Sequence, residues 1–181
     1  MSKLILIPTP IGNLDDITLR AIECIKDTDL ILCEDTRRSL KLMNHLEIKK
    51  PLKSFHKFNE HSMVEKIVIE IQSGTKVGLI SDAGTPSISD PGYLIVKMCI
   101  DNNIDVECLP GPTALIPALA ISGLPSERFT FEGFLPVKKG RKTRLQELSL
   151  EKRTMIFYES PYKLYKTLKD FYDFFGPDRE I

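Results

Sequence analysis

The 181-residue sequence has no tryptophan, three histidines and four cysteines, so several kinds of site have few residues to form them. The cysteines show no CxxC spacing and lie within apolar periods, which predicts buried free thiols of a cytosolic protein rather than a disulfide framework or a zinc site. The histidines have no cysteine or carboxylate at ligand spacing, so we expect no metal. These residues are Cys24, Cys33, Cys99, Cys108, His45, His56 and His61.

The sequence also lacks net charge, because 25 basic side chains balance 25 acidic ones. Overall charge therefore gives no indication of nucleic acid, and such a partner has to be recognised by a local cluster. Apolar runs stay shorter than the roughly 18 residues of a membrane helix, and no targeting segment is recognisable. We therefore expect a cytoplasmic protein that does not span a membrane.

Short apolar runs alternate with amphipathic stretches along the first two thirds of the chain. The apolar runs predict strands at 4–7, 30–33, 52–55, 76–81 and 105–109. The periodic stretches between them predict four helices, the first capped by Asn13 and the fourth by Asp90, with Pro91 at its first position. This alternation predicts an α/β fold with a doubly wound, mostly parallel five-stranded sheet in residues 1–122.

Three of the predicted strands end in loops rich in proline and glycine, at 8–13, 82–86 and 110–112. Such loops cannot continue a strand, and they expose backbone N–H groups. Ligands of parallel α/β sheets bind at the carboxyl ends of the strands. We therefore expect the three loops to meet at one edge of the sheet and to form a ligand site.

Residues 123–181 follow a different pattern, which predicts the beginning of a second α/β lobe. Residues 123–126 are expected to be a linker, 129–135 and 154–158 strands, and 138–150 a basic helix. A last helix is expected to be capped by Ser160 and Pro161. In the stretch before the linker, Pro117 implies a helix that is kinked or begins late.

Five segments together resemble one known family. They are PTPIGNLDDIT at 8–18, CEDTRRS at 33–39, LISDAGTPSISDPG at 79–92, PGPTALIPALAISGLP at 110–125 and FYESPYKL at 157–164. They resemble the bacterial 16S ribosomal RNA ribose 2′-O-methyltransferases of the tetrapyrrole methylase superfamily, which also includes the precorrin methylases and diphthine synthase. The family continues for several more strands, so the resemblance implies a chain truncated at its C-terminal lobe.

The resemblance implies S-adenosylmethionine as cofactor, held in a cleft between two α/β lobes. Small residues allow backbone amides to approach the cofactor. Tyr158 and Glu159, at the end of a second-lobe strand, face it by the same analogy. The sequence SDAGTP alone also fits a tight turn, PGPTA a structural turn, and the Tyr158 and Glu159 pair a surface strand end. The implied pocket residues of the first lobe are Pro10, Asp82, Ala83, Gly84, Thr85, Ser87, Ile88, Thr113 and Ala114.

Polar residues at two further strand ends are candidates for catalysis. A ribose hydroxyl is a weak nucleophile, so a general base or a cation would assist methyl transfer. Asp35 or Glu34 is a candidate base, Arg37 a partner of phosphate or hydroxyl, and His56 a third candidate. These clusters equally fit a solvated rim or a set of ion pairs. In the family the loop around His56 is commonly richer in histidine and acid than FHKFNEH, which offers Asn59 and Glu60 as alternatives.

Residues 138–144 carry the densest charge in the sequence. For an RNA substrate these cations would contact phosphates, and the cluster contains no aromatic residue that would stack on a base. The alternative is a solvated helix face. The candidate RNA-binding residues are Lys138, Lys139, Arg141, Lys142 and Arg144.

The sequence thus predicts a methyltransferase that modifies a ribose 2′-hydroxyl of a cytidine in 16S ribosomal RNA. The family implies the small ribosomal subunit as partner and a homodimer. Two alternatives stay open. One is a methylase of the same fold acting on a tetrapyrrole or a protein, and the other is a non-catalytic nucleotide-binding or RNA-binding fragment. The truncation leaves open whether this chain is itself active.

Overall fold

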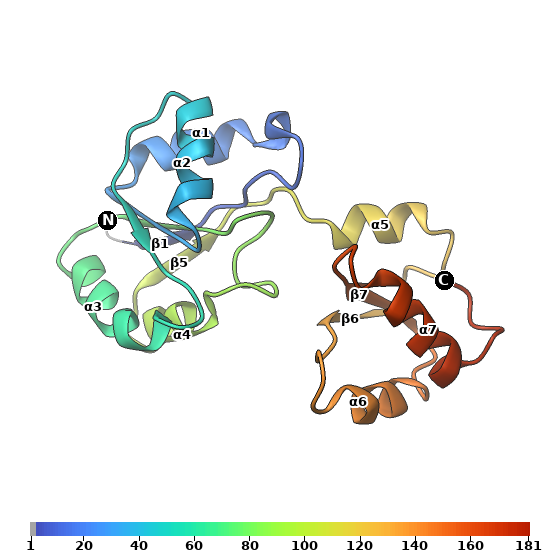
Figure 1. Cartoon of the computed structure of the whole chain (residues 1–181). Coiled ribbons are helices and arrows are strands. Elements are labelled where there is room, and N and C mark those ends of the chain that lie inside the picture. Colours follow the sequence, from blue (N-terminus) through green and yellow to red (C-terminus); the bar gives the residue numbers. More distant parts are fainter. Residues whose placement is uncertain (1–2) are drawn as a thin grey trace. The chain divides into compact units, whose positions relative to one another are not determined.

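The computed structural model describes residues 3–181, and the chain divides into two compact units, Met1–Ala114 and Leu115–Ile181 (Figure 1). The sequence pattern predicted the division after residue 122, immediately before the linker of 123–126. Helix α5 (Leu115–Ile121) instead belongs to the second unit. Its Ala118 and Leu119 line a cavity of about 820 Å³ together with residues of the second unit. The boundary between the units therefore precedes α5.

The first unit is built on a five-stranded sheet in the order β3-β2-β4-β1-β5. All of its strand pairs are parallel, with Leu4 of β1 opposite Val77 of β4 and Val106 of β5. The predicted doubly wound fold is therefore confirmed. The strands are β1 (Lys3–Leu6), β2 (Leu30–Cys33), β3 (Leu52–Ser54), β4 (Val77–Ile80) and β5 (Asp105–Cys108).

Helices cover both faces of this sheet (Figure 1). Helices α1 (Leu19–Asp27) and α2 (Thr36–His45) pack on one face, and α3 (Glu60–Gln72) and α4 (Tyr93–Asp101) pack on the other. The chain runs from β1 through β2 to β3 and then returns to β4 and β5, so right-handed crossovers place the two helix pairs on opposite faces.

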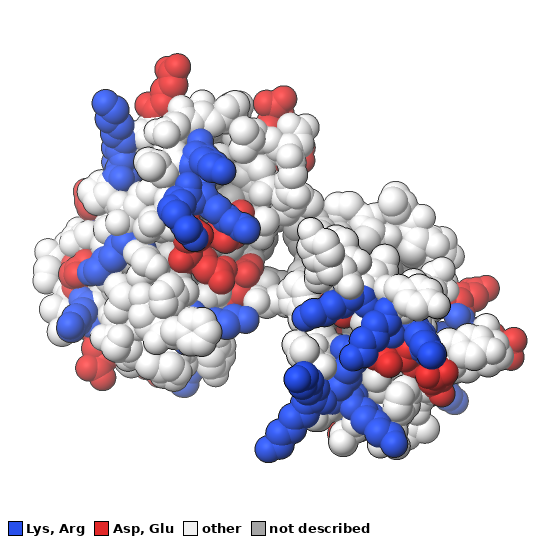
Figure 2. All heavy atoms as spheres, in the orientation of Figure 1, with Lys and Arg blue, Asp and Glu red and all other residues white. Residues whose placement is uncertain are grey.

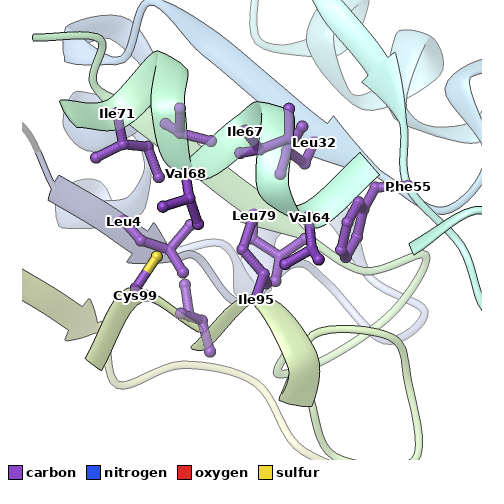
Figure 3. Close-up of a cluster of buried hydrophobic side chains, with 12 residues drawn as sticks. Leu4, Leu32, Phe55, Val64, Ile67, Val68, Ile71, Leu79, Ile95 and Cys99 are labelled. Carbon is purple, nitrogen blue, oxygen red and sulfur yellow. The ribbon is translucent and has the colours of Figure 1, made fainter. Parts of the chain in front are cut away.

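Burial on both faces explains why the strands are continuous apolar runs rather than alternating ones. All of β4 is buried, and so are the last three residues of β1 and β2. On the α3 and α4 face, Leu4, Leu32 and Leu79 of the sheet meet Ile67 and Ile95 of the helices (Figure 3). This layer fixes the positions of the strand ends that carry the loops.

Two predicted helix starts in the first unit were wrong. Asn13 caps a short 3-10 helix, Leu14–Asp16, and α1 begins later, because the Thr18 hydroxyl accepts a hydrogen bond from the backbone N–H of Ala21. Helix α4 starts after Gly92, whose φ of 141° breaks the chain direction, so Asp90 lies in the preceding loop. Asn13 and Asp90 are residue types that commonly cap helices, but Thr18 is the cap of α1 and Gly92 directly precedes α4.

The second unit contains a parallel pair of strands, β6 (Phe129–Phe134) and β7 (Thr154–Tyr158), with α6 (Arg141–Leu148) and α7 (Leu164–Phe175). Leu145, Leu148 and Phe171 form its core with Leu135. Both helices begin about three residues after their predicted starts. Gly140, at φ 83°, precedes α6, and residues 160–163 form a turn before α7.

Pro117 is the third residue of α5, where its missing N–H costs nothing because the first turn of a helix has no internal acceptors for its N–H groups. The helix therefore starts late enough to accommodate the proline, which is one of the two predicted possibilities. None of the helices within residues 3–181 has the length and apolar character needed to cross a lipid bilayer.

The four cysteines are free thiols, as predicted, but they are not all buried. Cys33 and Cys99 are buried, Cys24 is half-buried, and Cys108 is exposed. Cys108 ends β5, an edge strand that the neighbouring elements cover incompletely. Burial raises the pKa of Cys99 to about 11, so this thiol stays protonated at neutral pH.

Ile67→Ala is expected to lower the free energy of unfolding by about 2–5 kcal/mol, because it leaves a cavity in the layer between α3 and the sheet. Ile67 is 0% exposed, and Ile69 on the same helix is 61% exposed. Ile69→Ala is therefore the matched control and should change stability by no more than about 0.5 kcal/mol. Urea unfolding of the two variants measures the difference, and equal losses would contradict this account of the core.

Candidate active site

The ends of β1 and β4 form the point of the sheet where ligands of α/β proteins bind. The two strands are neighbours, yet β1 leads to α1 on one face and β4 leads to α4 on the other. Their loops therefore lie at the carboxyl ends of neighbouring strands, where ligands of such sheets bind. These loops, residues 8–13 and 81–92, are two of the three that the sequence predicted to form a ligand site.

Backbone hydrogen bonds join the two loops. The N–H of Thr9 donates to the Gly84 carbonyl and the N–H of Gly84 donates to the Thr9 carbonyl, each at 2.9 Å. The Thr9 hydroxyl donates to the Ser81 carbonyl at 3.0 Å, and the Ser81 hydroxyl donates to the Gly84 carbonyl at 3.0 Å. Thr9 and Ser81 are buried, so these bonds satisfy polar groups that water does not reach.

The loop after β5 joins the same assembly. The Thr85 hydroxyl donates to the Pro112 carbonyl at 3.2 Å. Gly111 packs against Pro8 so closely that a Cβ atom on Gly111 would lie 2.6 Å from the Pro8 Cβ. The loops after β1, β4 and β5 therefore meet at one edge of the sheet in the first unit, as the sequence predicted.

The loop after β4 holds an unusual backbone and an unpaired hydroxyl. Gly84 has φ 85°, and Ser87 and Ser89 have φ 69° and 63°, values that side-chain-bearing residues rarely adopt. The Ser87 Oγ is buried and has no hydrogen-bond partner among the described residues. Strained backbone and an unsatisfied polar atom mark a loop shaped for a ligand rather than for its own stability.

The structure brings the predicted cofactor residues of the first unit into three neighbouring loops. Pro10 lies in the loop after β1, residues 82–88 lie in the loop after β4, and Thr113 and Ala114 follow β5. Gly84 has the left-handed backbone that glycine adopts readily, and the buried Ser87 hydroxyl nearby in the same loop has no partner among the described residues. These residues fit a group such as S-adenosylmethionine.

Asp82 connects this loop to the start of α2. Its carboxylate accepts a hydrogen bond from the backbone N–H of Asp35 at 3.2 Å and forms an ion pair with Arg38 at 3.3 Å. The candidate catalytic residues Glu34 and Asp35 thus lie between β2 and α2, and Arg37 lies in the first turn of α2, which begins at Thr36.

Asp35 is the N-cap of α2, and Arg37 holds its carboxylate. Oδ1 accepts from the backbone N–H of Arg37 at 2.9 Å and from its Nε at 3.0 Å, and Oδ2 accepts from the guanidinium at 2.7 Å. The Arg37 side chain, with help from its backbone N–H, holds the pKa of Asp35 well below the usual range of a carboxyl. Asp35 is therefore a weak base that orients Arg37.

A cavity of about 440 Å³ contains all three predicted catalytic residues, Asp35, Arg37 and His56, together with Glu34 and Asp82. The His56 backbone N–H donates to Asn59 Oδ1 at 2.8 Å, and its Nδ1 accepts from the backbone N–H of Phe58 at 3.3 Å. Residues at the ends of β2, β3 and β4 thus meet in one place. Charged side chains of both signs are grouped on the first unit in Figure 2.

Asp90, which the sequence pattern assigned to a helix cap, lies in the loop between β4 and α4. Burial, reinforced by the nearby Glu34 carboxylate, raises the pKa of Asp90 to about 6, although Lys57 opposes the shift. A carboxyl with such a pKa exchanges a proton near neutral pH. The sequence Asp90-Pro91 is typical of a helix start, so it gave no sign that Asp90 lies in the loop before α4.

In the second unit, Glu159 follows β7 and its carboxylate is held by two hydrogen bonds. Its Oε1 accepts from the Ser160 backbone N–H at 2.8 Å, and its Oε2 accepts from the Thr167 hydroxyl at 2.6 Å. Arg141 donates to the same hydroxyl at 2.8 Å. The ring of Tyr158 packs edge-on against Phe131, with centroids 4.9 Å apart.

The basic cluster divides into two kinds of side chain. Arg141 is 12% exposed and pairs with Asp170 at 2.8 Å, and Arg144 pairs with Glu132 and Glu147. In contrast, three lysines are exposed and form no ion pair within residues 3–181, and cations gather over α6 in Figure 2. These lysines are Lys138, Lys139 and Lys142.

A search of residues 3–181 finds no group of three or more histidine, cysteine, aspartate or glutamate side chains arranged to hold a metal ion.

Comparison with known proteins matches residues 3–181 to the model of the tetrapyrrole (corrin/porphyrin) methylases. A Thermotoga maritima protein named ribosomal RNA small subunit methyltransferase I is 49% identical over the whole chain, which spans 81% of that protein. A Synechocystis protein of the same name is 47% identical, again over the whole chain, which here spans 65% of the relative.

Solved structures share the fold at low identity. The uroporphyrin-III C-methyltransferase of Thermus thermophilus has a TM-score of 0.67 and 18% identity, covering 98% of this chain and 76% of its own. The complex of that enzyme with S-adenosylhomocysteine has a TM-score of 0.63 and 17% identity, covering 95% and 76%. The chain therefore belongs to the tetrapyrrole methylase family, and the relatives that it matches from end to end are named ribosomal RNA small subunit methyltransferase I.

Proposed function

We propose that this chain is part of an S-adenosylmethionine-dependent methyltransferase that modifies the ribose 2′-hydroxyl of a cytidine in 16S ribosomal RNA. The observation that carries the proposal is the hydrogen-bonded pair of loops at the carboxyl ends of β1 and β4, found in a chain whose whole length matches relatives named ribosomal RNA small subunit methyltransferase I. The expected partner is the small ribosomal subunit. A homodimer is part of the proposal, to be tested by sedimentation.

In the first unit, the cofactor would be held by Pro10, Asp82, Ala83, Gly84, Thr85, Ser87, Ile88, Thr113 and Ala114. When bound, it supplies a methyl group on a positively charged sulfur. The unpaired Ser87 hydroxyl would bind one of its polar atoms, and Thr9 and Ser81 keep this loop in place. The likeness to an enzyme crystallised with S-adenosylhomocysteine supports the choice.

The residues of the 440 Å³ cavity would hold the ribose and its phosphates. Asp35 directs the guanidinium of Arg37, which is 87% exposed and free to contact a phosphate on its other side. His56 accepts a hydrogen bond at Nδ1, so the neutral ring carries its proton on Nε2 and can donate it to a substrate oxygen.

The decisive assay is methyl transfer from labelled S-adenosylmethionine to small ribosomal subunits that lack the modification. Label in the ribose of a 16S cytidine supports the proposal. Label in a uroporphyrinogen-like compound or in a ribosomal protein instead would favour the alternative substrates. Failure to bind the cofactor, both in this chain and in one extended to the length of its relatives, would contradict the proposed class of enzyme.

Gly84→Val is expected to abolish binding of S-adenosylmethionine in isothermal titration calorimetry. Gly84 has φ 85°, and an added Cβ would lie 3.4 Å from Ile11, so valine strains the loop and fills the proposed pocket. Gly74→Val is the matched control, because Gly74 has φ 108° and open space around it. It should strain the backbone equally and leave binding unchanged. Circular dichroism confirms that both variants fold.

Asp90→Asn is expected to stabilise the protein at pH 7 and not at about pH 4. The folded-state pKa of about 6 lies above the ordinary 3.8, so the folded protein retains a proton that the unfolded chain loses. Stability therefore falls as pH rises from about 4 to about 6, and the asparagine variant lacks this fall. Urea unfolding across that range measures it. Asp105→Asn, at an exposed position on β5, is the control, and an identical profile there would refute the assignment.

Changing Lys138, Lys139 and Lys142 together to glutamine is expected to weaken binding to ribosomal RNA and to flatten its salt dependence. Each lost phosphate contact lowers the slope of log affinity against log salt by about 0.7–0.9. The control changes three lysines that already form ion pairs, Lys26, Lys76 and Lys97, and removes the same charge. Equal effects of the two triple variants, measured by fluorescence anisotropy, would mean that only net charge matters.

A further inference from the structure

Phe58 lies on the rim of the 440 Å³ cavity with its ring in solvent. The residue is 97% exposed, although a phenylalanine ring usually gains free energy by burial. An exposed apolar residue needs no explanation when it stands alone. This ring is different, because it borders a cavity that also contains Arg37, Lys57 and His56.

The backbone beneath Phe58 is rigid. The Asn59 amide donates to the Ser54 carbonyl at 3.0 Å, and its Oδ1 accepts from the His56 N–H at 2.8 Å. The N–H groups of Asn59 and Glu60 both bond to the His56 carbonyl, at 3.0 and 2.9 Å. The turn that presents Phe58 is therefore fixed before any ligand binds, which lowers the entropy lost on binding.

The ring of Phe58 also keeps a face available. Its aromatic neighbour is His56, which meets it at 67° with the ring centroids 6.0 Å apart. An edge-on neighbour at this distance does not cover the ring faces, in agreement with the almost complete exposure. A flat group can therefore stack on Phe58.

The chemistry of the cavity indicates which flat group this is. Its lining is charged and polar apart from Phe58, which does not suit an apolar helix or peptide. Asp35 is neutralised by Arg37 and Asp82 by Arg38, so the carboxylates do not make it strongly acidic. A nucleotide matches this set: phosphate on Arg37 or Lys57, hydroxyls on carboxylates, and a base on the ring. The volume lies within the roughly 300–1,000 Å³ of small-ligand sites.

We infer that Phe58 stacks on an unpaired base of the RNA substrate and holds that nucleotide at the cavity. Proteins recognise RNA sequence mostly in single-stranded segments, whose bases stack on aromatic side chains. Enzymes that act on a single nucleotide commonly draw it out of its stack. The inference rests on the proposed function and adds the contact that selects an unpaired nucleotide.

The absence of tryptophan from the sequence allows a direct test. Phe58→Trp places one tryptophan in the chain, and its fluorescence should be quenched on titration with a short single-stranded oligocytidylate. A blunt RNA duplex should leave the signal unchanged. Ile69→Trp, at an exposed position on the same unit that does not line the cavity, is the control and should respond to neither RNA.

Phe58→Ala is expected to weaken binding of the same oligonucleotide by about 5-fold to 100-fold, as the loss of one stacked base does elsewhere. Phe58→Tyr should retain the affinity, and Phe58→Leu, which is apolar but cannot stack, should not. Equal affinity of the alanine variant and the parent would overturn the inference. The same holds if the fluorescence of the Phe58→Trp variant responds to intact small subunits but not to their extracted RNA, because the ring would then contact protein.

The outcome is separable from that of the proposed function. If the parent chain binds RNA and a chain of full family length methylates it, with no effect of Phe58→Ala on either, the inference fails alone. If the parent binds no RNA at any tested concentration and transfers no methyl group, the proposed function fails, and the inference with it.

Discussion

The reciprocal backbone pair between Thr9 and Gly84 is the constraint on which the first unit's site depends. At the carboxyl ends of β1 and β4, this pair continues the contact of the two strands beyond the sheet and joins the loop after β4 to the loop after β1. The buried Thr9 hydroxyl satisfies the Ser81 carbonyl, and the buried Ser81 hydroxyl gives the Gly84 carbonyl a second hydrogen bond. Because the first turn is fixed in this way, the following residues can adopt strained conformations without loosening the sheet.

The carboxylates at this edge of the sheet lie in different environments, which shift their pKa values in opposite directions. Asp35 is held ionised by Arg37, and Asp82 is used to tie α2 to the loop after β4, whereas burial near Glu34 raises the pKa of Asp90 to about 6. Groups of one chemical type whose pKa values are driven apart have different roles available to them. An ionised carboxylate can orient a cation, and a half-buried one can accept a proton.

The sequence was sufficient for the sheet, because continuous apolar runs followed by Pro-Gly loops have few other interpretations, and it placed the three ligand loops at one edge. It was insufficient where two residues competed for one local role. Asn13 and Thr18 both make good caps, and Asp90 with Pro91 forms a helix start that the chain does not use, since the left-handed turns at Ser87 and Ser89 carry it onward to Gly92. Such a choice depends on tertiary contacts, which have no local signal.

The sequence of the basic cluster at 138–144 likewise did not show which of its cations form ion pairs within the second unit. Arg141 and Arg144 are three residues apart and so lie on one face of α6, where acidic residues of the second unit meet them. The lysines before and between them remain in solvent. A chain with no net charge exerts little long-range attraction on RNA, so affinity has to come from a few unpaired cations and from contacts that salt does not screen. Stacking on Phe58 is a contact of that second kind, and it would favour an unpaired nucleotide over the duplex that surrounds it.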